Sequence, residues 1–119
     1  MNDKFYVSLE AARLLKEKGY NEECKYIIYD DGEMFDYQYL KNQDLPKWKY
    51  SCPTKSEAID WLESKGMTIE IHWIKFNENR RWNYAIFNCN TCDTIDIRFI
   101  FSTRLEAEEA AIIKALELL

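Results

Sequence analysis

Apolar residues recur every three or four positions in three segments of the chain, and each segment follows a residue type that caps helices. Ser8 precedes the first segment. Thr54 and Thr103 precede the other two, each with a glutamate three positions later, at Glu57 and Glu106. This Thr-x-x-Glu spacing is typical of a capping box, so the pattern predicts three helices, the third running to the last residue. The apolar stripes are Leu9, Ala11, Ala12, Leu14 and Leu15; Ala58, Ile59, Trp61 and Leu62; and Leu105, Ile112, Leu116 and Leu119.

The three glycines stand where such helices end or where a hairpin turns. Gly19 and Gly66 follow the first and second helical segments. A glycine in that place adopts the left-handed conformation without the penalty that a β-carbon brings. Gly32 follows Asp31 between two segments with strand-like patterns, and Asp-Gly there is typical of a tight hairpin turn.

The remaining segments alternate between apolar and polar residues, which is the pattern of half-buried strands. Short polar stretches at 77–80 and 88–93 connect the later strands, so we expect consecutive strands to pair antiparallel. In the last strand, the alternating apolar set is Ile95, Ile97, Phe99 and Phe101. The strands expected from alternation are 24–29, 34–39, 67–73, 81–86 and 94–101.

The resulting order is helix, two strands, helix, three strands, helix. It predicts an α+β protein with an antiparallel sheet and helices packed on one face of that sheet. A length of 119 residues corresponds to a single domain, 1–119. Within it, residues 1–50 (helix and hairpin) and 51–119 (helix, three strands, helix) can be divided as two units.

Charge and hydropathy narrow the classes of function. Lys and Arg number 16 and Asp and Glu number 21, which gives a net charge of −5. This acidic balance argues against a protein that coats nucleic acid or an anionic membrane. No apolar run approaches the roughly 20 residues that span a bilayer, and Glu10 and Arg13 interrupt the layout of a secretion signal. We therefore expect a cytoplasmic protein that does not contact membranes.

Side chains that could carry out catalysis are few. His72 is the single histidine, and it lies on the polar side of an expected strand beside Glu70. No Ser-His-Asp or Cys-His grouping follows from local spacing, and no phosphate loop or dinucleotide fingerprint is present. We therefore expect a protein that is not an enzyme and uses no cofactor.

The cysteines offer one candidate for metal binding. Cys89 and Cys92 form a Cys-x-x-Cys pair in an expected turn, which is where zinc knuckles place their thiolates. A tetrahedral site needs two further ligands, and Cys24, Cys52 and His72 are each isolated in the sequence. We expect Cys24 and Cys52 to be small buried hydrophobes, and we expect no metal site, with Cys89 and Cys92 as the weak candidates for one.

Two segments, Lys47–Tyr50 and Arg80–Trp82, mix cations with aromatic residues. Our leading hypothesis is a non-enzymatic interaction module, in which half-buried aromatics form a patch for a protein partner or a second copy of the chain. An alternative is nucleic-acid binding, in which aromatics stack on bases and cations lie near phosphates. In a third interpretation the aromatics only cover the core while the lysines keep the loop soluble. The interaction residues would be Trp48, Tyr50, Trp73 and Trp82, and the nucleic-acid contacts would be Lys47, Lys49, Arg80 and Arg81.

Acidic residues concentrate at positions 22–36, where six acids stand against one base. Together with the C-terminal helix, this segment suggests a variant of the nucleic-acid hypothesis. In that variant the chain is an acidic mimic of nucleic acid and acts on a DNA-handling protein.

Residues 54–119 have the order helix, three strands, helix and resemble the double-stranded-RNA-binding domain. The resemblance is carried by residues 102–111 and 114–116, which look like the final helix of that family. In the family, a basic cluster at the start of this helix contacts phosphates, whereas here Arg104 is followed by three glutamates. The resemblance therefore implies a shared topology only.

The whole chain is also similar to a group of small proteins carried by prophages and conjugative elements of gut bacteria. The matching features are Val7–Gly19, Ser51–Thr54 leading into Trp61 and Leu62, and the terminal EAEEAAIIKALELL. This resemblance implies an accessory role in a mobile element and supplies neither an activity nor site residues.

Overall fold

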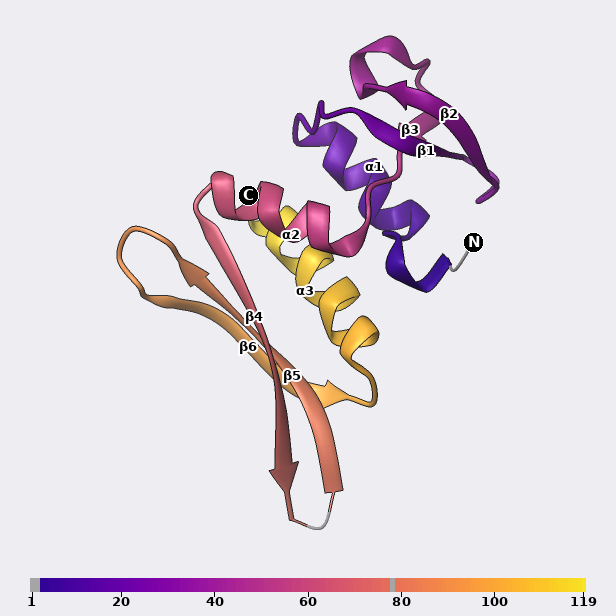
Figure 1. The fold of residues 1–119 in the computed structure, drawn as a ribbon. Helices are drawn as coiled ribbons and strands as arrows, with labels where there is room; N and C mark the ends of the chain where they lie inside the picture. Colours follow the sequence, from indigo (N-terminus) through magenta and orange to yellow (C-terminus); the bar gives the residue numbers. More distant parts are fainter. Residues whose placement is uncertain (1–2, 78) are drawn as a thin grey trace.

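The structure, a computed structural model, describes residues 3–77 and 79–119 and confirms the α+β class (Figure 1). The helices are α1 (Leu9–Glu17), α2 (Lys55–Ser64) and α3 (Arg104–Leu118), with short 3-10 helices η1 (Asp3–Phe5) and η2 (Asn42–Asp44). The strands are β1 (Cys24–Tyr29), β2 (Met34–Leu40), β3 (Lys49–Ser51), β4 (Met67–Phe76), β5 (Asn79–Asn88) and β6 (Thr94–Phe101).

The helices begin at the predicted caps. The Ser8 side chain accepts a hydrogen bond from the Ala11 N–H at 3.2 Å. At α2, Thr54 and Glu57 form the full capping box, with backbone-to-side-chain distances of 2.9 and 3.1 Å. At α3 the Thr103 hydroxyl accepts from the Glu106 N–H.

The capping box predicted for α3 is formed only in part. The Glu106 carboxylate accepts its hydrogen bond from the Ser102 N–H at 3.2 Å, one residue before the cap. The helix therefore starts where the sequence predicts it. The Glu106 carboxylate, however, accepts from the N–H of Ser102 and not from that of the cap residue Thr103. Gly19 and Gly66 both have positive φ, at +95° and +97°, as expected after a helix.

The first sheet has the strand order β2-β1-β3. β1 and β2 form the predicted hairpin, and Gly32 in its turn has φ +89°. β3 does not follow from the sequence pattern, because three residues are too few to show alternation. It pairs with the free edge of β1, so Tyr50 lies opposite Ile28. The first hairpin therefore forms its own sheet with β3 instead of extending the sheet that follows.

The second sheet has the order β4-β5-β6, with both neighbouring pairs antiparallel. β4 and β5 are longer than predicted, because their ladder continues from Met67 opposite Asn88 to Phe76 opposite Asn79. The expected connection at 77–80 is thus shorter than predicted, since residues 79 and 80 already belong to β5. Residue 78 lies outside the described part of the chain.

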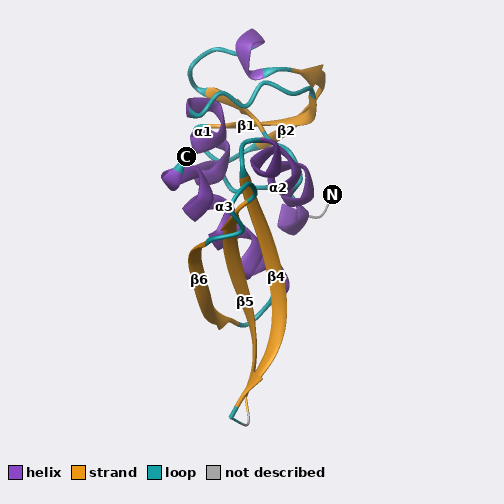
Figure 2. Cartoon of the chain, turned by 90° about the vertical axis from the view of Figure 1, so that its left-hand side faces the viewer, coloured by secondary structure: helices purple, strands orange, loops and turns teal. Residues whose placement is uncertain are grey.

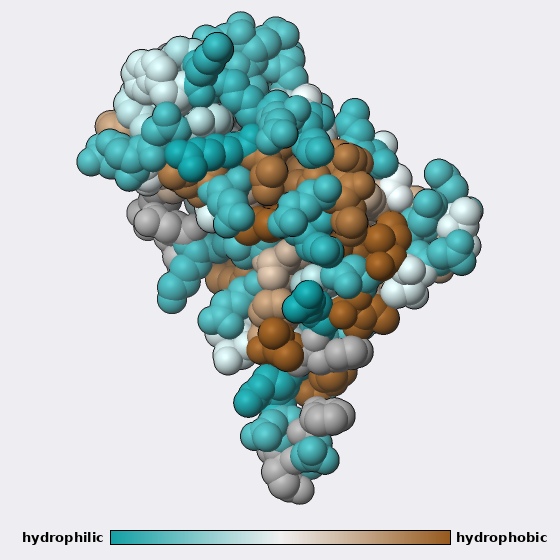
Figure 3. Space-filling view, turned by 180° about the vertical axis from the view of Figure 1, so that it is seen from behind, coloured by the Kyte–Doolittle hydropathy of each residue, from teal (hydrophilic) through white to brown (hydrophobic). Residues whose placement is uncertain are grey.

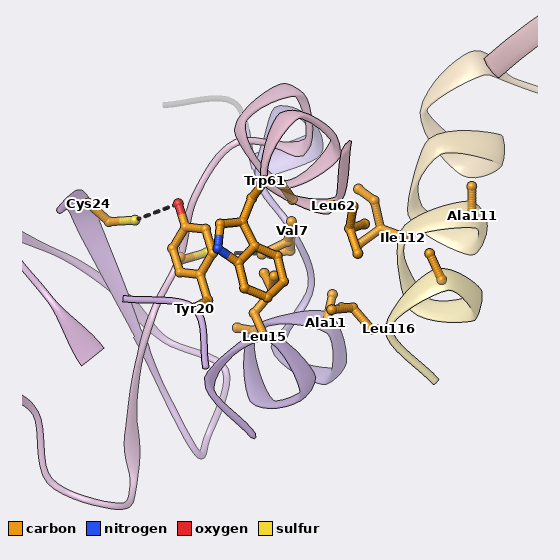
Figure 4. Packing of buried hydrophobic residues seen from close by; sticks show 14 of the residues in the cluster. Val7, Ala11, Leu15, Tyr20, Cys24, Trp61, Leu62, Ala111, Ile112 and Leu116 are labelled. Carbon is orange, nitrogen blue, oxygen red and sulfur yellow. Dashed lines mark hydrogen bonds between the residues drawn. The ribbon is translucent and has the colours of Figure 1, made fainter. Parts of the chain in front are cut away.

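The helices form a layer in the middle of the molecule. α1 lies against the first sheet, and α3 crosses one face of the second sheet (Figures 1 and 2). Leu15, Leu62 and Ile112, one from each helix, are fully buried and belong to the same core cluster. Figure 4 shows Tyr20 and Trp61 beside these aliphatic side chains, with ring centroids 5.4 Å apart. A single continuous core therefore connects both parts of the chain.

The second sheet contributes only one of its faces to this core. Ile69, Ile71, Tyr84 and Ile86 point toward α3 and belong to or pack against the core cluster. Among the residues that the structure describes, no helix covers the opposite side of this sheet (Figure 1). Across the described residues, no helix has the length and hydrophobicity that crossing a membrane requires.

Candidate interaction surfaces

The distal ends of β4 and β5 form an arm that extends beyond α3 (Figure 1). On this arm Trp73 lies directly opposite Trp82 in the antiparallel ladder. Their rings are stacked, with centroids 6.0 Å apart and planes inclined by 20°. Trp73 is 55% exposed, although a large aromatic ring is normally buried in part by its neighbours. The pair therefore presents a broad aromatic surface to solvent.

Two arginines lie over this tryptophan pair. The Arg80 guanidinium carbon is 4.9 Å from the ring centroid of Trp73, and the Arg104 guanidinium carbon is 5.8 Å from that of Trp82. Arg104 also forms an ion pair with Glu108 at 2.8 Å. Cation–π contacts of this kind contribute about 0.5–1 kcal/mol each at exposed sites. We call Trp73, Arg80, Trp82 and Arg104 the arm surface.

An apolar pocket of about 720 Å³ adjoins the arm surface at the start of α3. Phe101 connects the two, because it lines the pocket and lies opposite Trp82 in the sheet. Leu105, Ala110 and Ile113 supply most of the remaining apolar lining. Lys55 is also at this pocket, but its ammonium donates to the carbonyl oxygens of Lys4 and Tyr6 and so fixes the backbone.

The other predicted aromatics, Trp48 and Tyr50, lie at the first sheet and not with Trp73 and Trp82. Trp48 is 49% exposed and contacts Tyr29 edge-on at 5.4 Å. The Lys49 ammonium lies 4.7 Å from the Trp48 ring centroid, and Lys47 is exposed beside them. The structure therefore divides the four predicted interaction residues into two separate pairs.

Tyr50 is part of a hydrogen-bond network that attaches β3 to α1. Its hydroxyl donates to Asp30 Oδ1 at 2.8 Å, and Arg13 donates to the same oxygen at 3.1 Å. These two hydrogen bonds hold the pKa of Asp30 below its ordinary value. Lys16 donates to the carbonyl oxygens of Pro46 and Lys49, both at 2.8 Å. These contacts give Tyr50 a structural role.

The predicted cations Arg80 and Arg81 lie on opposite faces of β5. Arg80 is on the side of the tryptophans, whereas Arg81 follows it in the strand and points to the other side. Arg81 Nη1 donates to the carbonyl oxygen of Arg80 at 2.9 Å. The two arginines therefore cannot act together on one ligand surface.

The Cys-x-x-Cys pair lies in the turn between β5 and β6. Cys89 and Cys92, which we call the turn cysteines, are exposed and free. Cys89 Sγ lies 2.8 Å from Thr68 Oγ1, while Cys24 and Cys52 are buried in the core. Among residues 3–77 and 79–119, no three His, Cys, Asp or Glu side chains group closely enough to hold a metal ion.

His72 has one acid, Glu70, as its ion-pair neighbour, and several other acids line a separate hollow. His72 Nε2 lies 3.4 Å from Glu70 Oε2 on the exposed side of β4. A second hollow, of about 580 Å³, is lined by Glu22, Glu57 and Asp60 beside Trp61. Glu57 is already engaged at the cap of α2, and the Ser64 hydroxyl, which also lines this hollow, donates to the Trp61 carbonyl oxygen. Lys41 lies at the same hollow among its carboxylates.

Two features of these surfaces were not predicted from the sequence. Arg104 over Trp82 joins residues 22 positions apart, and only the pairing of β5 with β6 brings them together. The apolar pocket likewise forms where α3 leaves the sheet. No protein-family model, no curated protein and no solved structure matches this chain. Both resemblances stated above therefore stay predictions.

Proposed function

We propose that this chain is a non-enzymatic protein-interaction module that binds its partner through the arm surface. The observation that supports this most is the solvent-exposed Trp73 stacked on Trp82, with Arg80 beside it. Tryptophan and arginine are the residue types in which the binding energy of protein interfaces is most often concentrated. A stacked pair of tryptophans whose positions are fixed by the antiparallel ladder is preorganised for binding.

The pocket beside the arm surface indicates the chemistry of the partner. Its lining of Phe101, Leu105 and Ile113 suits an apolar side chain. Arg80 next to it suits a carboxylate, because guanidinium groups pair with carboxylates bidentately. Arg104 is already paired with Glu108, and Glu106 and Glu109 at the pocket itself disfavour a second acid there. The partner segment would therefore combine a large apolar side chain with one acidic residue on the side of Arg80.

A displayed peptide library tests this proposal. Peptides would be selected on the whole protein and then measured against Trp73→Ala, Arg80→Ala and the matched control Trp48→Ala, which removes a similarly exposed tryptophan from the other sheet. We expect selected peptides to bind about tenfold or more weakly to the two arm variants and unchanged to the control. Equal binding to all variants would exclude the arm surface as the site.

Nucleic-acid binding is the second candidate, and the two arginines over the stacked indoles favour it. Bases stack on exposed aromatics while arginines contact phosphates. Fluorescence anisotropy with a labelled single-stranded oligonucleotide distinguishes this candidate from the first. Binding that weakens steeply with salt and is lost in Trp73→Ala would support it, whereas no binding at low salt would exclude it.

A further inference from the structure

β6 is an outer strand of the second sheet, and no described strand pairs with its outer edge. The strand order is β4-β5-β6, and within residues 3–77 and 79–119 β6 forms ladders with β5 alone. Figure 2 shows β6 at the margin of the sheet. On such an edge, backbone N–H and C=O groups point outward at alternate residues, and a further strand pairs with them as a row. The edge is therefore a template for one more strand.

The sequence of β6 leaves this edge without the usual protection. Lysine and proline are typical residues that block an exposed edge, and β6 contains neither. Ile97 and Ile100 are instead 41% and 70% exposed. The register against β5 shifts on both sides of positions 96–98, where Ile97 lies opposite Ala85. A regular stretch this short, between two irregular ones, favours pairing with one short segment over the joining of whole sheets.

A groove runs along α3 beside this edge. α3 packs against β5 and β4 more than against β6, and a hollow of about 450 Å³ lies between β6 and the outer side of α3. This hollow shares Phe101, Ala110 and Ile113 with the apolar pocket at the start of α3, so the two are continuous along the helix. Figure 2 places β6 on the side from which Figure 3 is seen, and hydrophobic surface gathers in the middle of that view.

We propose that the partner binds as an extended segment, which adds to the outer edge of β6 as a fourth strand and places alternate side chains in the groove along α3. The inference rests on the proposed function, since the same segment continues from the arm surface and the apolar pocket along β6. Main-chain hydrogen bonds supply affinity in this mode of binding, and pockets for alternate side chains supply specificity. A helical partner would leave the outer backbone groups of β6 unpaired.

Two cations line the groove beside the regular stretch of β6. Arg98 and Lys114 both line the hollow, and neither forms an ion pair with a residue that the structure describes. Glu117 is the one acid in its lining, while Asp96 on β6 accepts a hydrogen bond from the Tyr84 hydroxyl at 2.6 Å. Because the lining has two cations and one acid, a carboxylate is the side chain of the added strand that suits it best.

An added strand that runs antiparallel to β6 has a defined order of side chains. β6 ends at Phe101, beside the pocket and the arm surface, so the N-terminal part of the segment lies there. Arg98 is level with Tyr84, four residues from Arg80 and about 14 Å away along the ladder. From its N-terminal to its C-terminal end, the segment therefore carries an acidic residue for Arg80, a large apolar residue for the pocket and a second acidic residue for Arg98.

Backbone methylation of a bound peptide tests the proposal without altering the protein. The probe is a synthetic, fluorescein-labelled peptide of ten residues selected from the displayed library on the whole chain. Each internal position is N-methylated in turn, and binding is measured by fluorescence anisotropy. We expect affinity to fall about tenfold or more at every second position and to change little between them, because alternate N–H groups point toward β6. Losses without this period of two would overturn the proposal.

Charge reversals locate the pairing at β6. Arg98→Glu, on the strand, and Lys114→Glu, on α3, should each weaken binding of the probe about tenfold or more. The control, Arg81→Glu, reverses a charge on the opposite side of the sheet and should leave the affinity unchanged. Circular dichroism checks that each variant folds, and variants on two different elements keep the test decisive if one does not. A period of two with unchanged affinity in both variants would place the segment at another edge and overturn the proposal.

The outcomes separate this inference from the proposed function. Loss of binding in Trp73→Ala without a period of two keeps the arm surface as the site and overturns strand addition. A period of two with unchanged binding in Trp73→Ala keeps strand addition and excludes the arm surface. A selection that yields no binding peptide overturns both. In that case, a dimer in light scattering that Arg98→Glu dissociates would identify a second copy of this chain as the occupant of the edge.

Discussion

The segment between β2 and β3 is held in place by one buried amide, and replacing it tests how the first sheet is closed. Asn42 is buried, its Nδ2 donates to the Tyr20 carbonyl oxygen and its Oδ1 accepts from the Ser51 N–H, both at 2.8 Å. Ser51 pairs with Ile27 on β1. The side chain thus joins β3 to the loop that follows α1, and we expect Asn42→Ala to release both backbone groups.

The loss of stability in Asn42→Ala can be estimated from the two backbone groups that lose their hydrogen-bond partner. Two buried backbone groups, one donor and one acceptor, lose their partners, and each costs about 1–3 kcal/mol when it stays unpaired. Partial entry of water lowers the sum, so we expect a loss of about 2–4 kcal/mol in the free energy of unfolding. That is a large share of the stability of a domain of this size.

Asn21 provides a matched control in the same region. Its side chain makes two hydrogen bonds with Gln43, at 2.9 and 3.0 Å, but both are exposed to water. Water replaces such partners, so Asn21→Ala should cost less than about 1 kcal/mol. Urea unfolding followed by circular dichroism measures both values, and the reasoning fails if Asn42→Ala costs no more than Asn21→Ala.

Three further predictions concern titration, thiol chemistry and packing. The hydrogen bonds that lower the pKa of Asp30 stabilise the fold at neutral pH, and this contribution is lost as the pH falls through the lowered pKa. The difference in urea midpoint between the wild type and Asp30→Asn should therefore shrink between about pH 6 and about pH 2. Burial raises the pKa of Cys24 to about 11, so at about pH 8 Ellman's reagent should modify the turn cysteines quickly, and Cys24 and Cys52 only after unfolding. Ile112→Ala, at a fully buried position between helices and sheet, should cost about 2–5 kcal/mol in urea unfolding.

Sequence signals that act within a few residues were sufficient to predict most of the helices and strands. Caps at Ser8 and Thr54 and glycines after α1 and α2 act within a few residues, so the sequence alone places these elements. β3 could not be predicted, because its three residues are held by the edge of β1 and by Asn42, which are distant in sequence. The tryptophan pair on the arm could not be predicted either, because the stacking of Trp73 on Trp82 depends on the register of the β4–β5 ladder.

β6 shows why the exposure of Ile95 and Ile97 was not predicted. Strict alternation would put Ile95, Ile97 and Phe101 on the same side of the sheet. The register of β6 against β5 shifts at two places, one before Tyr84 and one after Ile86, and each shift of one residue moves the following side chains to the other face. Phe101 consequently packs on Tyr84 in the core at 5.7 Å, while Ile95 and Ile97 point to solvent. The separation of the exposed Ile95 and Ile97 from the packed Phe101 therefore arises from the bulges in this strand, and hydrophobic alternation carries no signal of where a bulge falls.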